Sequence, residues 1–492
     1  MFDQLRRLFK HSLVYGMAET VSRGTGFILL FIYGIVLTKD DIGLRSAVYV
    51  ASAFLGIFYT LGLDNAFLRY FMDDELAEKK AELFSSAFFF SMLTGFFFLV
   101  FALFNSETIS LILTKYPTYD YIIRLLFIIM IFDTVVIYPT QVLRAENRLL
   151  YFSLVAFTRF FLFILLNLFF VWRLKRGLKG IFEANLIVVF TIAVLLLPVF
   201  LKYLRGRISF SILKKMLTFG IPTIFTILCM RVIDFSDRQV INYLLGETAL
   251  GEYSVAYNLG MVGVMVFINS FRIAWQPFFL SEKNYPNARE MFSRVATYYA
   301  MIIGMVFLGI TLFREEIFTL FVAYFKSEYP LSLSKIVPLV SLAYMFFGFY
   351  IIMMAGIFIR EKTRYLPIVT FIAAALNVGL NFIFVPVFGT IGAAYTTVIA
   401  YFAMVLVMYL ISMNIYRVNY EFKRLGLVML FTAVPIGLSL IFTPDGKVMR
   451  LLYHGVLLFV PVIGYISTGF ILQEERIRLK QILKNLINRM EK

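Results

Sequence analysis

Apolar stretches of about twenty residues follow one another along the whole chain, separated by short polar segments. A helix with a rise of about 1.5 Å per residue needs about this length to cross the roughly 30 Å hydrocarbon core of a bilayer. The pattern predicts fourteen transmembrane helices, at residues 13–37, 44–63, 83–104, 121–142, 151–172, 181–203, 217–241, 250–280, 294–313, 335–358, 365–387, 391–413, 425–443 and 451–472. We therefore expect an all-α polytopic membrane protein.

The composition agrees with this pattern. Hydrophobic residues make up 61% of the chain and charged residues 15%, against about 45–50% and about 25% in a typical soluble protein. The first apolar run follows the basic segment MFDQLRRLFKH and continues without a small-residue cleavage signal, so we expect a retained helix rather than a signal peptide. No predicted loop exceeds about twenty residues, so any function lies within the helical bundle.

The positions of the basic residues predict the orientation. If the N-terminus is cytoplasmic, 28 of the 46 Lys and Arg residues lie on that side and 12 on the other, with residues at helix boundaries counted in the adjoining loop. Cytoplasmic loops carry an excess of Lys and Arg, so both termini are expected in the cytoplasm and the protein in the cytoplasmic membrane. The net charge of +16 then orients the protein and does not indicate nucleic-acid binding. The basic tail at 474–492 is expected to lie on the inner membrane surface.

Cysteine and histidine are scarce. Cys229 is the single cysteine, and His11 and His454 are far apart in sequence. This excludes an intramolecular disulfide and a zinc-type ligand cluster, and no paired carboxylates suggest catalysis. We expect no catalytic residue, no metal site and no enzymatic activity.

The chain also repeats itself. The segment DIGLRSAVY at 41–49 matches LGEYSVAY at 250–257 at a spacing of 208 residues, and LNLFFV at 166–171 matches LNFIFV at 380–385 at a spacing of 214. RAENR at 144–148 falls opposite REKTR at 360–364. A duplication of six helices gives two parallel, pseudo-symmetric lobes around a central cavity. The predicted division is an N-lobe at 1–205, a C-lobe at 206–413, and two further helices with the tail at 414–492.

Several longer segments indicate a family. They are GFILLFIYGIVLTKDDIG and LGLDNAFLRYF in the first half, and FGIPTIF, SDRQVINYLLGETALGEYSVAYNLG, AWQPF and REKTRYLPIVTFIAAALNVGLNFIFVPVFGTIGAAYTT in the second. Together they resemble the polysaccharide-transporter branch, which includes the O-antigen (Wzx-type) flippases, of the multidrug/oligosaccharidyl-lipid/polysaccharide (MOP) exporter superfamily. The resemblance implies a flippase that moves a polyprenyl-diphosphate-linked oligosaccharide across the cytoplasmic membrane by alternating access. It implies membrane lipids and polysaccharide polymerase or assembly proteins as partners, and no cofactor beyond H⁺ or Na⁺ coupling.

Charged residues inside the predicted helices are the candidate functional groups, because an ionisable side chain costs about 2.5–3.5 kcal/mol to place in mid-membrane even on a lenient scale. Arg231, Asp234, Asp237 and Arg238 form one polar stripe on the helix at 217–241. Asp234 is spaced to neutralise both arginines, so a structural ladder and a functional site are both open. Asp237 and Arg238, near the outer end, suggest an interfacial or structural role.

Arg231 has a counterpart across the repeat. The spacing of 208 residues places Arg23 opposite it, with Glu19 one turn earlier. Guanidinium groups bind phosphate bidentately and stay charged when partly desolvated, so two such arginines suit a diphosphate that enters between the lobes.

Three further charges extend this hypothesis. Arg159 and Arg272 have no acid at helical spacing and form a second pair of phosphate candidates. Asp133 suits a bridge to another helix or a protonatable coupling group. The predicted substrate residues are Arg23, Arg231, Arg159 and Arg272, and the predicted ladder or coupling residues are Glu19, Asp133, Asp234 and Arg238. Asn377 and Asn381, with Asn167 in the matching place of the first copy, suggest helix packing more than glycan binding.

Three other functions compete with the first. A cation-coupled multidrug exporter of the same superfamily would favour acidic residues, which Glu19 and Asp133 supply. A murein-precursor lipid flippase would differ mainly in its sugar head. A membrane-embedded glycosyltransferase or polymerase would need catalytic groups on substantial loops, which the short loops disfavour.

Overall fold

The computed structural model describes residues 39–114, 116–325 and 329–468, together with residues 4, 8, 29, 33, 36, 37 and 470. Over this part of the chain the protein is helical and contains no strand. The helices are α2 (Lys39–Thr60), α3 (Leu63–Phe71), α4 (Lys80–Thr114), α5 (Asp120–Ala145), α6 (Leu149–Asn167), α7 (Gly177–Leu195), α8 (Leu197–Tyr203), α9 (Phe210–Leu245), α10 (Glu247–Glu282), α11 (Ala288–Leu312), α12 (Arg314–Phe325), α13 (Ile336–Ile359), α14 (Tyr365–Phe388), α15 (Thr390–Ile415), α16 (Phe422–Ile441) and α17 (Lys447–Ser467). Four short helices join them: η1 (Asp74–Lys79), η2 (Pro117–Tyr119), η3 (Leu168–Arg173) and η4 (Leu331–Lys335).

The prediction of an all-α polytopic membrane protein is confirmed. Within the described residues, 12 helices are long and apolar enough to cross a membrane, and they correspond to the last twelve of the predicted spans. The predicted helix at 44–63 corresponds to α2, whereas the one at 13–37 and the tail at 474–492 lie outside the described residues. The prediction of a loop after residue 313 is wrong in part, because α12 occupies Arg314–Phe325.

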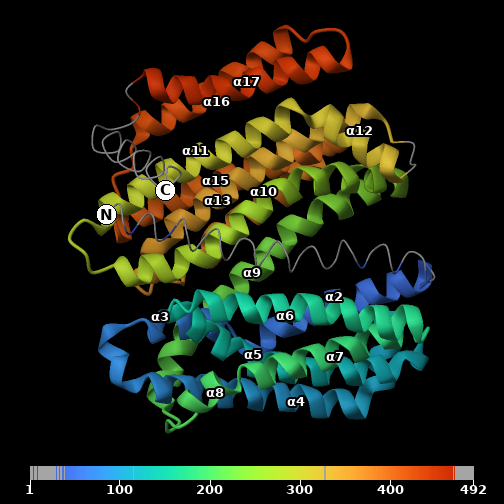
Figure 1. The fold of residues 1–492 in the computed structure, drawn as a ribbon, viewed down its shortest axis with the longest axis vertical. Helices are drawn as coiled ribbons and strands as arrows, with labels where there is room; N and C mark the ends of the chain where they lie inside the picture. The colour runs from blue at the N-terminus through green and yellow to red at the C-terminus, as the bar shows by residue number, and fades with distance from the viewer. Residues whose placement is uncertain are drawn as a thin grey trace, which may run out of the picture.

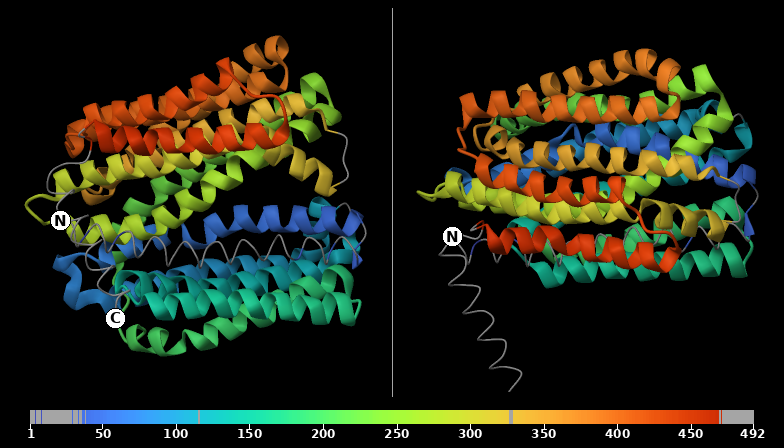
Figure 2. Two further views of the ribbon diagram at one scale, coloured as in Figure 1. Left: turned by 45° about the horizontal axis from the view of Figure 1, so that its top comes forward. Right: turned by 90° about the horizontal axis from the view of Figure 1, so that it is seen from above.

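The helices form two bundles that lie side by side (Figure 1). In the first bundle, α4 packs against α5 and α2, and α7 against α5 and α6. In the second, α13 and α14 pack against α15, α9 against α14, and α10 against α13. The two last helices, α16 and α17, pack on α11 at the outside of the second bundle. Figure 2 shows most helices running in a common direction. The division at 205 and 413 stays a prediction.

The two bundles repeat each other in local detail. Helices α2 and α10 begin 208 residues apart, the spacing of the sequence repeat. The turns after α5 and α13 share one pattern, in which the N–H of Arg148 donates to the carbonyl of Leu143 and that of Lys362 to Ile357, both at 2.9 Å. This bond closes a helix end over a left-handed residue, here Asn147 and Glu361. The turns correspond at a spacing of 214, two fewer than the RAENR and REKTR motifs suggest.

The bundles meet closely at one end. Between α2 and α3 the backbone turns through Leu61 and Gly62, both with positive φ. A Cβ atom on Gly62 would lie 2.3 Å from the carbonyl oxygen of Gly220 in α9. Glycine is needed here for its backbone conformation and for this close approach. The N–H of Ser209, just before α9, also donates to Ser86 of α4 at 2.9 Å.

Candidate functional site

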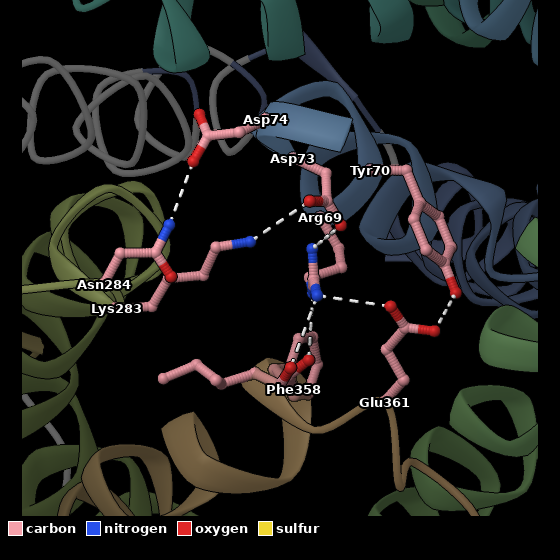
Figure 3. Close-up of polar contacts among 9 residues, drawn as sticks. Arg69, Tyr70, Asp73, Asp74, Lys283, Asn284, Phe358 and Glu361 are labelled. Carbon is pink, nitrogen blue, oxygen red and sulfur yellow. Dashed lines mark hydrogen bonds and ion pairs between the residues drawn. The ribbon is translucent and has the colours of Figure 1, made fainter. Parts of the chain in front are cut away.

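Arg69 of α3 connects the two bundles at this end (Figure 3). Its Nε donates to the carbonyl of Phe358 at 3.1 Å and its Nη2 to the carbonyl of Ile359 at 3.3 Å, both at the end of α13. The same guanidinium forms ion pairs with Asp73 at 2.8 Å and with Glu361 at 3.2 Å. The side chain is only 4% exposed. A buried charge is tolerated when it is paired and hydrogen-bonded, so Arg69 depends on the two bundles being together.

Further polar contacts surround this arginine. Tyr70 donates from its hydroxyl to Glu361 at 2.8 Å, and Lys283, just after α10, pairs with Asp73 at 3.3 Å. Burial acts to raise the pKa of Asp73, but the hydrogen bond and charge of Arg69, together with Lys283, outweigh it and hold the pKa below its ordinary value. We call this set the latch; it consists of Arg69, Tyr70, Asp73, Asp74, Lys283, Asn284 and Glu361.

A second contact mirrors the latch across the repeat. Arg144, at the end of α5, donates to the carbonyl of Ile273 in α10 at 3.0 Å. The end of α5 corresponds to the end of α13, and α10 corresponds to α2 and α3. Both arginines belong to the first bundle, and each guanidinium donates to a main-chain carbonyl of the second bundle, Arg69 from α3 to α13 and Arg144 from α5 to α10. Glu361 of the turn after α13 pairs with Arg69 of the other bundle. Glu146, in the corresponding turn after α5, instead pairs within its own bundle, with Lys202 and Arg148.

Among the residues that the structure describes, the side-chain hydrogen bonds that join the bundles lie at this end. In the predicted orientation it is the cytoplasmic end, since it holds the turns between α3 and α4, α5 and α6, and α13 and α14.

A buried carboxylate lies within the second bundle. Asp237 of α9 is 1% exposed. It accepts hydrogen bonds from the hydroxyl of Tyr253 at 2.8 Å, from Asn381 Nδ2 at 2.8 Å and from Thr397 Oγ1 at 2.6 Å. Four helices, α9, α10, α14 and α15, thus converge on one carboxyl group.

A second layer of polar groups extends this cluster. Thr396 donates to Asn381 at 2.8 Å, and Ser236 donates to Asn377. Asn377 Nδ2 is buried and has no hydrogen-bond partner among the described residues. We call Asp237, Tyr253, Asn377, Asn381, Thr396 and Thr397 the carboxylate cluster.

The carboxylate cluster is rich in oxygen and contains no basic residue. Within the part of the chain that the structure describes, no ion pair involves Asp237, and no group of three or more His, Cys, Asp or Glu residues could hold a metal ion. A carboxylate in such a place is stable if it is protonated or if a cation neutralises it. The hydroxyl, amide and carboxylate oxygens here are hard ligands of the kind that alkali and alkaline-earth cations prefer.

The rest of the α9 stripe differs from the expected ladder. Arg238 donates to the main-chain carbonyl of Asp234 at 2.6 Å and lies over the ring of Tyr257 at 4.9 Å. The carboxylate of Asp234 accepts from Tyr344 at 3.4 Å. Among the described residues no ion pair joins Asp234 to Arg231 or Arg238, although both arginines act electrostatically on it. Arg231 itself is exposed.

The first bundle brings two predicted residues together. Arg159 of α6 forms an ion pair with Asp133 of α5 at 3.2 Å, and the arginine remains 45% exposed. This is the bridge to another helix that was one of the two interpretations of Asp133. Arg45 lies nearby, over the rings of Tyr33 at 4.8 Å and Tyr49 at 5.1 Å.

The structure describes only some of the remaining predicted residues. Arg272 is exposed on α10 and acts electrostatically on Asp64 of α3, as does Arg144. Arg23 and Glu19 lie outside the described residues, so the pairing of Arg23 with Arg231 stays a prediction.

The latch was not predicted from the sequence. Arg69 and Glu361 fall within predicted loops, at 64–82 and 359–364, where charged residues served only to predict the orientation. For Asp237 a usable signal existed, since Asn377, Asn381 and Thr397 all lie on helices of the same repeat.

Comparisons with known proteins agree with this architecture. The model of the family described as polysaccharide biosynthesis protein matches residues 8–282. An uncharacterized membrane protein of Methanocaldococcus jannaschii is 22% identical over 97% of this chain and 97% of its own.

Solved structures share the fold. A MOP superfamily transporter from Pyrococcus furiosus is 16% identical, with a TM-score of 0.68 over 87% of this chain and 97% of that chain. An outward-facing multidrug resistance MATE family transporter of the MOP superfamily is 17% identical, with a TM-score of 0.69 over 85% and 97%. With a family match over more than half of its length, the chain belongs to the polysaccharide biosynthesis protein family and has the fold of the MOP superfamily transporters.

Proposed function

We propose that the protein is a flippase that moves a polyprenyl-diphosphate-linked oligosaccharide across the cytoplasmic membrane by alternating access. The latch is the observation that carries this proposal, because among the described residues the polar contacts between two repeated bundles lie at one end, in a chain that belongs to a polysaccharide biosynthesis family. Bundles held in this way can separate at the latched end without unfolding either of them. No covalent chemistry is needed, and both termini lie in the cytoplasm in this proposal.

Exposed arginines on the helices suit the diphosphate. Three predicted substrate residues have exposed side chains: Arg231 on α9, Arg272 on α10 and Arg159 on α6. Arg23 is added to them because it corresponds to Arg231 in the sequence repeat. A guanidinium binds phosphate oxygens through two parallel hydrogen bonds and stays charged at all physiological pH values. The sugar head would pass between the bundles while the polyprenyl tail stays in lipid.

The carboxylate cluster suits the coupling ion. A Na⁺ ion or a proton at Asp237 would neutralise a buried carboxylate that forms hydrogen bonds but no ion pair among the described residues. The cluster joins four helices of the second bundle, so its occupancy can alter how that bundle packs. We propose this site for coupling in place of Asp133 and Asp234.

Transport in proteoliposomes tests the proposal. A fluorescent polyprenyl-diphosphate glycan is placed in the outer leaflet, and its movement is followed under an imposed Na⁺ or H⁺ gradient. The quadruple variant of Arg23, Arg159, Arg231 and Arg272 to Ala should lose transport, while Arg173→Ala, an exposed arginine next to a loop, should keep it. Full transport by a folded quadruple variant would contradict the phosphate site.

A cation-coupled multidrug exporter is the second candidate, since one structural neighbour is a multidrug resistance MATE family transporter. It predicts that organic cations compete with the glycan, or replace it, in the same assay. A murein-precursor flippase predicts transport of the murein lipid only.

A further inference from the structure

A pocket opens next to the latch, between the two bundles. It has a volume of about 330 Å³ and lies between Tyr70 of α3, the first turns of α9 and Glu361 of the turn after α13. Lys214 and Lys215 line it, and both side chains are exposed. The pocket thus touches the two residues, Tyr70 and Glu361, that form one of the hydrogen bonds of the latch.

The polar side chains of the pocket share one face of α9. Ser211 and Thr218 lie one turn before and one turn after the two lysines, and all four line the pocket. Among the described residues no acid lies within ion-pair distance of Lys214 or Lys215. Lys215 instead lies over the ring of Tyr70, with its Nζ 4.8 Å from the centroid. The two ammonium groups and the Ser211 hydroxyl are donors that fit the oxygens of a phosphate, while the Thr218 hydroxyl donates to the carbonyl of Lys214 at 2.8 Å.

We propose that this pocket binds a phosphate-bearing head group at the cytoplasmic end and thereby releases the latch. The inference rests on the proposed function, to which it adds the first contact of the diphosphate. An anionic bilayer lipid offers the same chemistry.

Charge explains why binding would loosen the latch. A phosphate in the pocket is brought next to the carboxylate of Glu361, which is held by Arg69 at 3.2 Å and Tyr70 at 2.8 Å. Two negative charges placed side by side repel each other. The phosphate also draws Lys215 away from the Tyr70 ring. Bound phosphate therefore favours the state in which Glu361 has moved away, and a ligand shifts an equilibrium by its difference in affinity for the two states.

Distances between spin labels test this inference without transport. Labels at Glu78→Cys in η1 and Asn287→Cys before α11, both exposed, report on the two bundles in a Cys229→Ser background that removes the only native thiol. Inorganic pyrophosphate should raise the population with a lengthened distance by about fivefold or more. The Lys214→Gln/Lys215→Gln variant should lose the response. Lys423→Gln, an exposed lysine at the start of α16, is the matched control and should keep it.

Two arms identify the source of the phosphate. In phosphatidylcholine vesicles the response to pyrophosphate or to a polyprenyl diphosphate indicates the substrate head, whereas a response to added phosphatidylglycerol alone indicates a bilayer lipid. Loss of either response in the double lysine variant supports the pocket.

No response in the wild type, or an unchanged response in the double lysine variant, overturns the inference. If the protein responds through the lysines but transports no glycan, the pocket proposal stands and the flippase proposal is wrong. If it transports glycan without the response, only the pocket proposal is wrong.

Discussion

The carboxylate of Asp237 in α9 accepts a hydrogen bond of 2.6 Å from the hydroxyl of Thr397 in α15, 160 residues further along the chain. This bond ties the first helix of the second bundle to its last repeated helix. The three groups that donate to it are neutral, so in the proposed coupling the charge state of Asp237 affects how these helices pack.

Replacement of Asp237 should therefore separate ion dependence from folding. We expect the Asp237→Asn variant to fold, because the amide has the size of the carboxyl group and keeps one of its oxygens. Its transport and thermal stability should no longer depend on Na⁺ or on pH. Thr397→Val leaves the carboxylate with one donor fewer and should cost about 1–3 kcal/mol of stability. Thermal unfolding in detergent with and without Na⁺ measures both effects. Thr191→Val, which removes a hydroxyl bonded only within α7, is the matched control. An Asp237→Asn variant with unchanged Na⁺ and pH dependence would exclude coupling at this site.

Removal of the Arg69 guanidinium should open the latched end. Arg69→Gln leaves Asp73 and Glu361 without their main partner and removes the bonds to the α13 carbonyls. Loss of one member of a buried ion pair costs about 3–5 kcal/mol of stability, and here it is the latched state that is destabilised.

The spin-label pair at residues 78 and 287 measures the effect, and the expected result is a predominantly lengthened distance. Arg205→Gln, an exposed arginine in the loop between α8 and α9, should leave the distance unchanged. An unchanged distance in Arg69→Gln would show that the latch does not hold the bundles together.

Acid should weaken the latch through Asp73. The pKa of this carboxyl lies below its ordinary value in the latched protein, so its contribution is fully present above the ordinary Asp pKa. It is lost as the pH falls through the lowered pKa, because the protonated acid no longer pairs with Arg69 and Lys283. The label distance measured from pH 7 to pH 3 should lengthen only below the ordinary pKa of about 3.9. Asp73→Asn should show the lengthened distance already at pH 7, with a smaller change on acidification.

A methyl group at Gly62 should also keep the bundles apart. The Cβ atom would lie 2.3 Å from the Gly220 carbonyl and 2.6 Å from the Thr223 hydroxyl, and the backbone φ of +74° disfavours alanine in addition. We expect Gly62→Ala to destabilise the latched state by about 1–3 kcal/mol. Gly56→Ala in α2 is the matched control, since nothing lies within 4 Å of its added Cβ. Equal label distances in the two variants would contradict the close approach.

The helices themselves follow from the sequence, because an apolar run of bilayer length has few other stable conformations in lipid. The repeat could be read in the same way, and its spacing of 208 residues reappears in the starts of α2 and α10. The exact alignment of the turn at Glu361 with its counterpart in the first bundle does not follow from the sequence. The position of its left-handed residue is set by main-chain hydrogen bonds and not by the flanking charges.

What the sequence by itself determined is therefore the membrane class, the helices and their duplication, all of which depend on local hydrophobicity and period. Only the tertiary structure decided which charges matter. Arg69 and Glu361 are 292 residues apart, and Asp237 meets Asn381 and Thr397 from other helices. A charged residue in the sequence looks the same whether it ends a loop or closes a contact between bundles. Its role is set by burial and by partners that helix packing brings together, and neither is contained in the spacing along one helix.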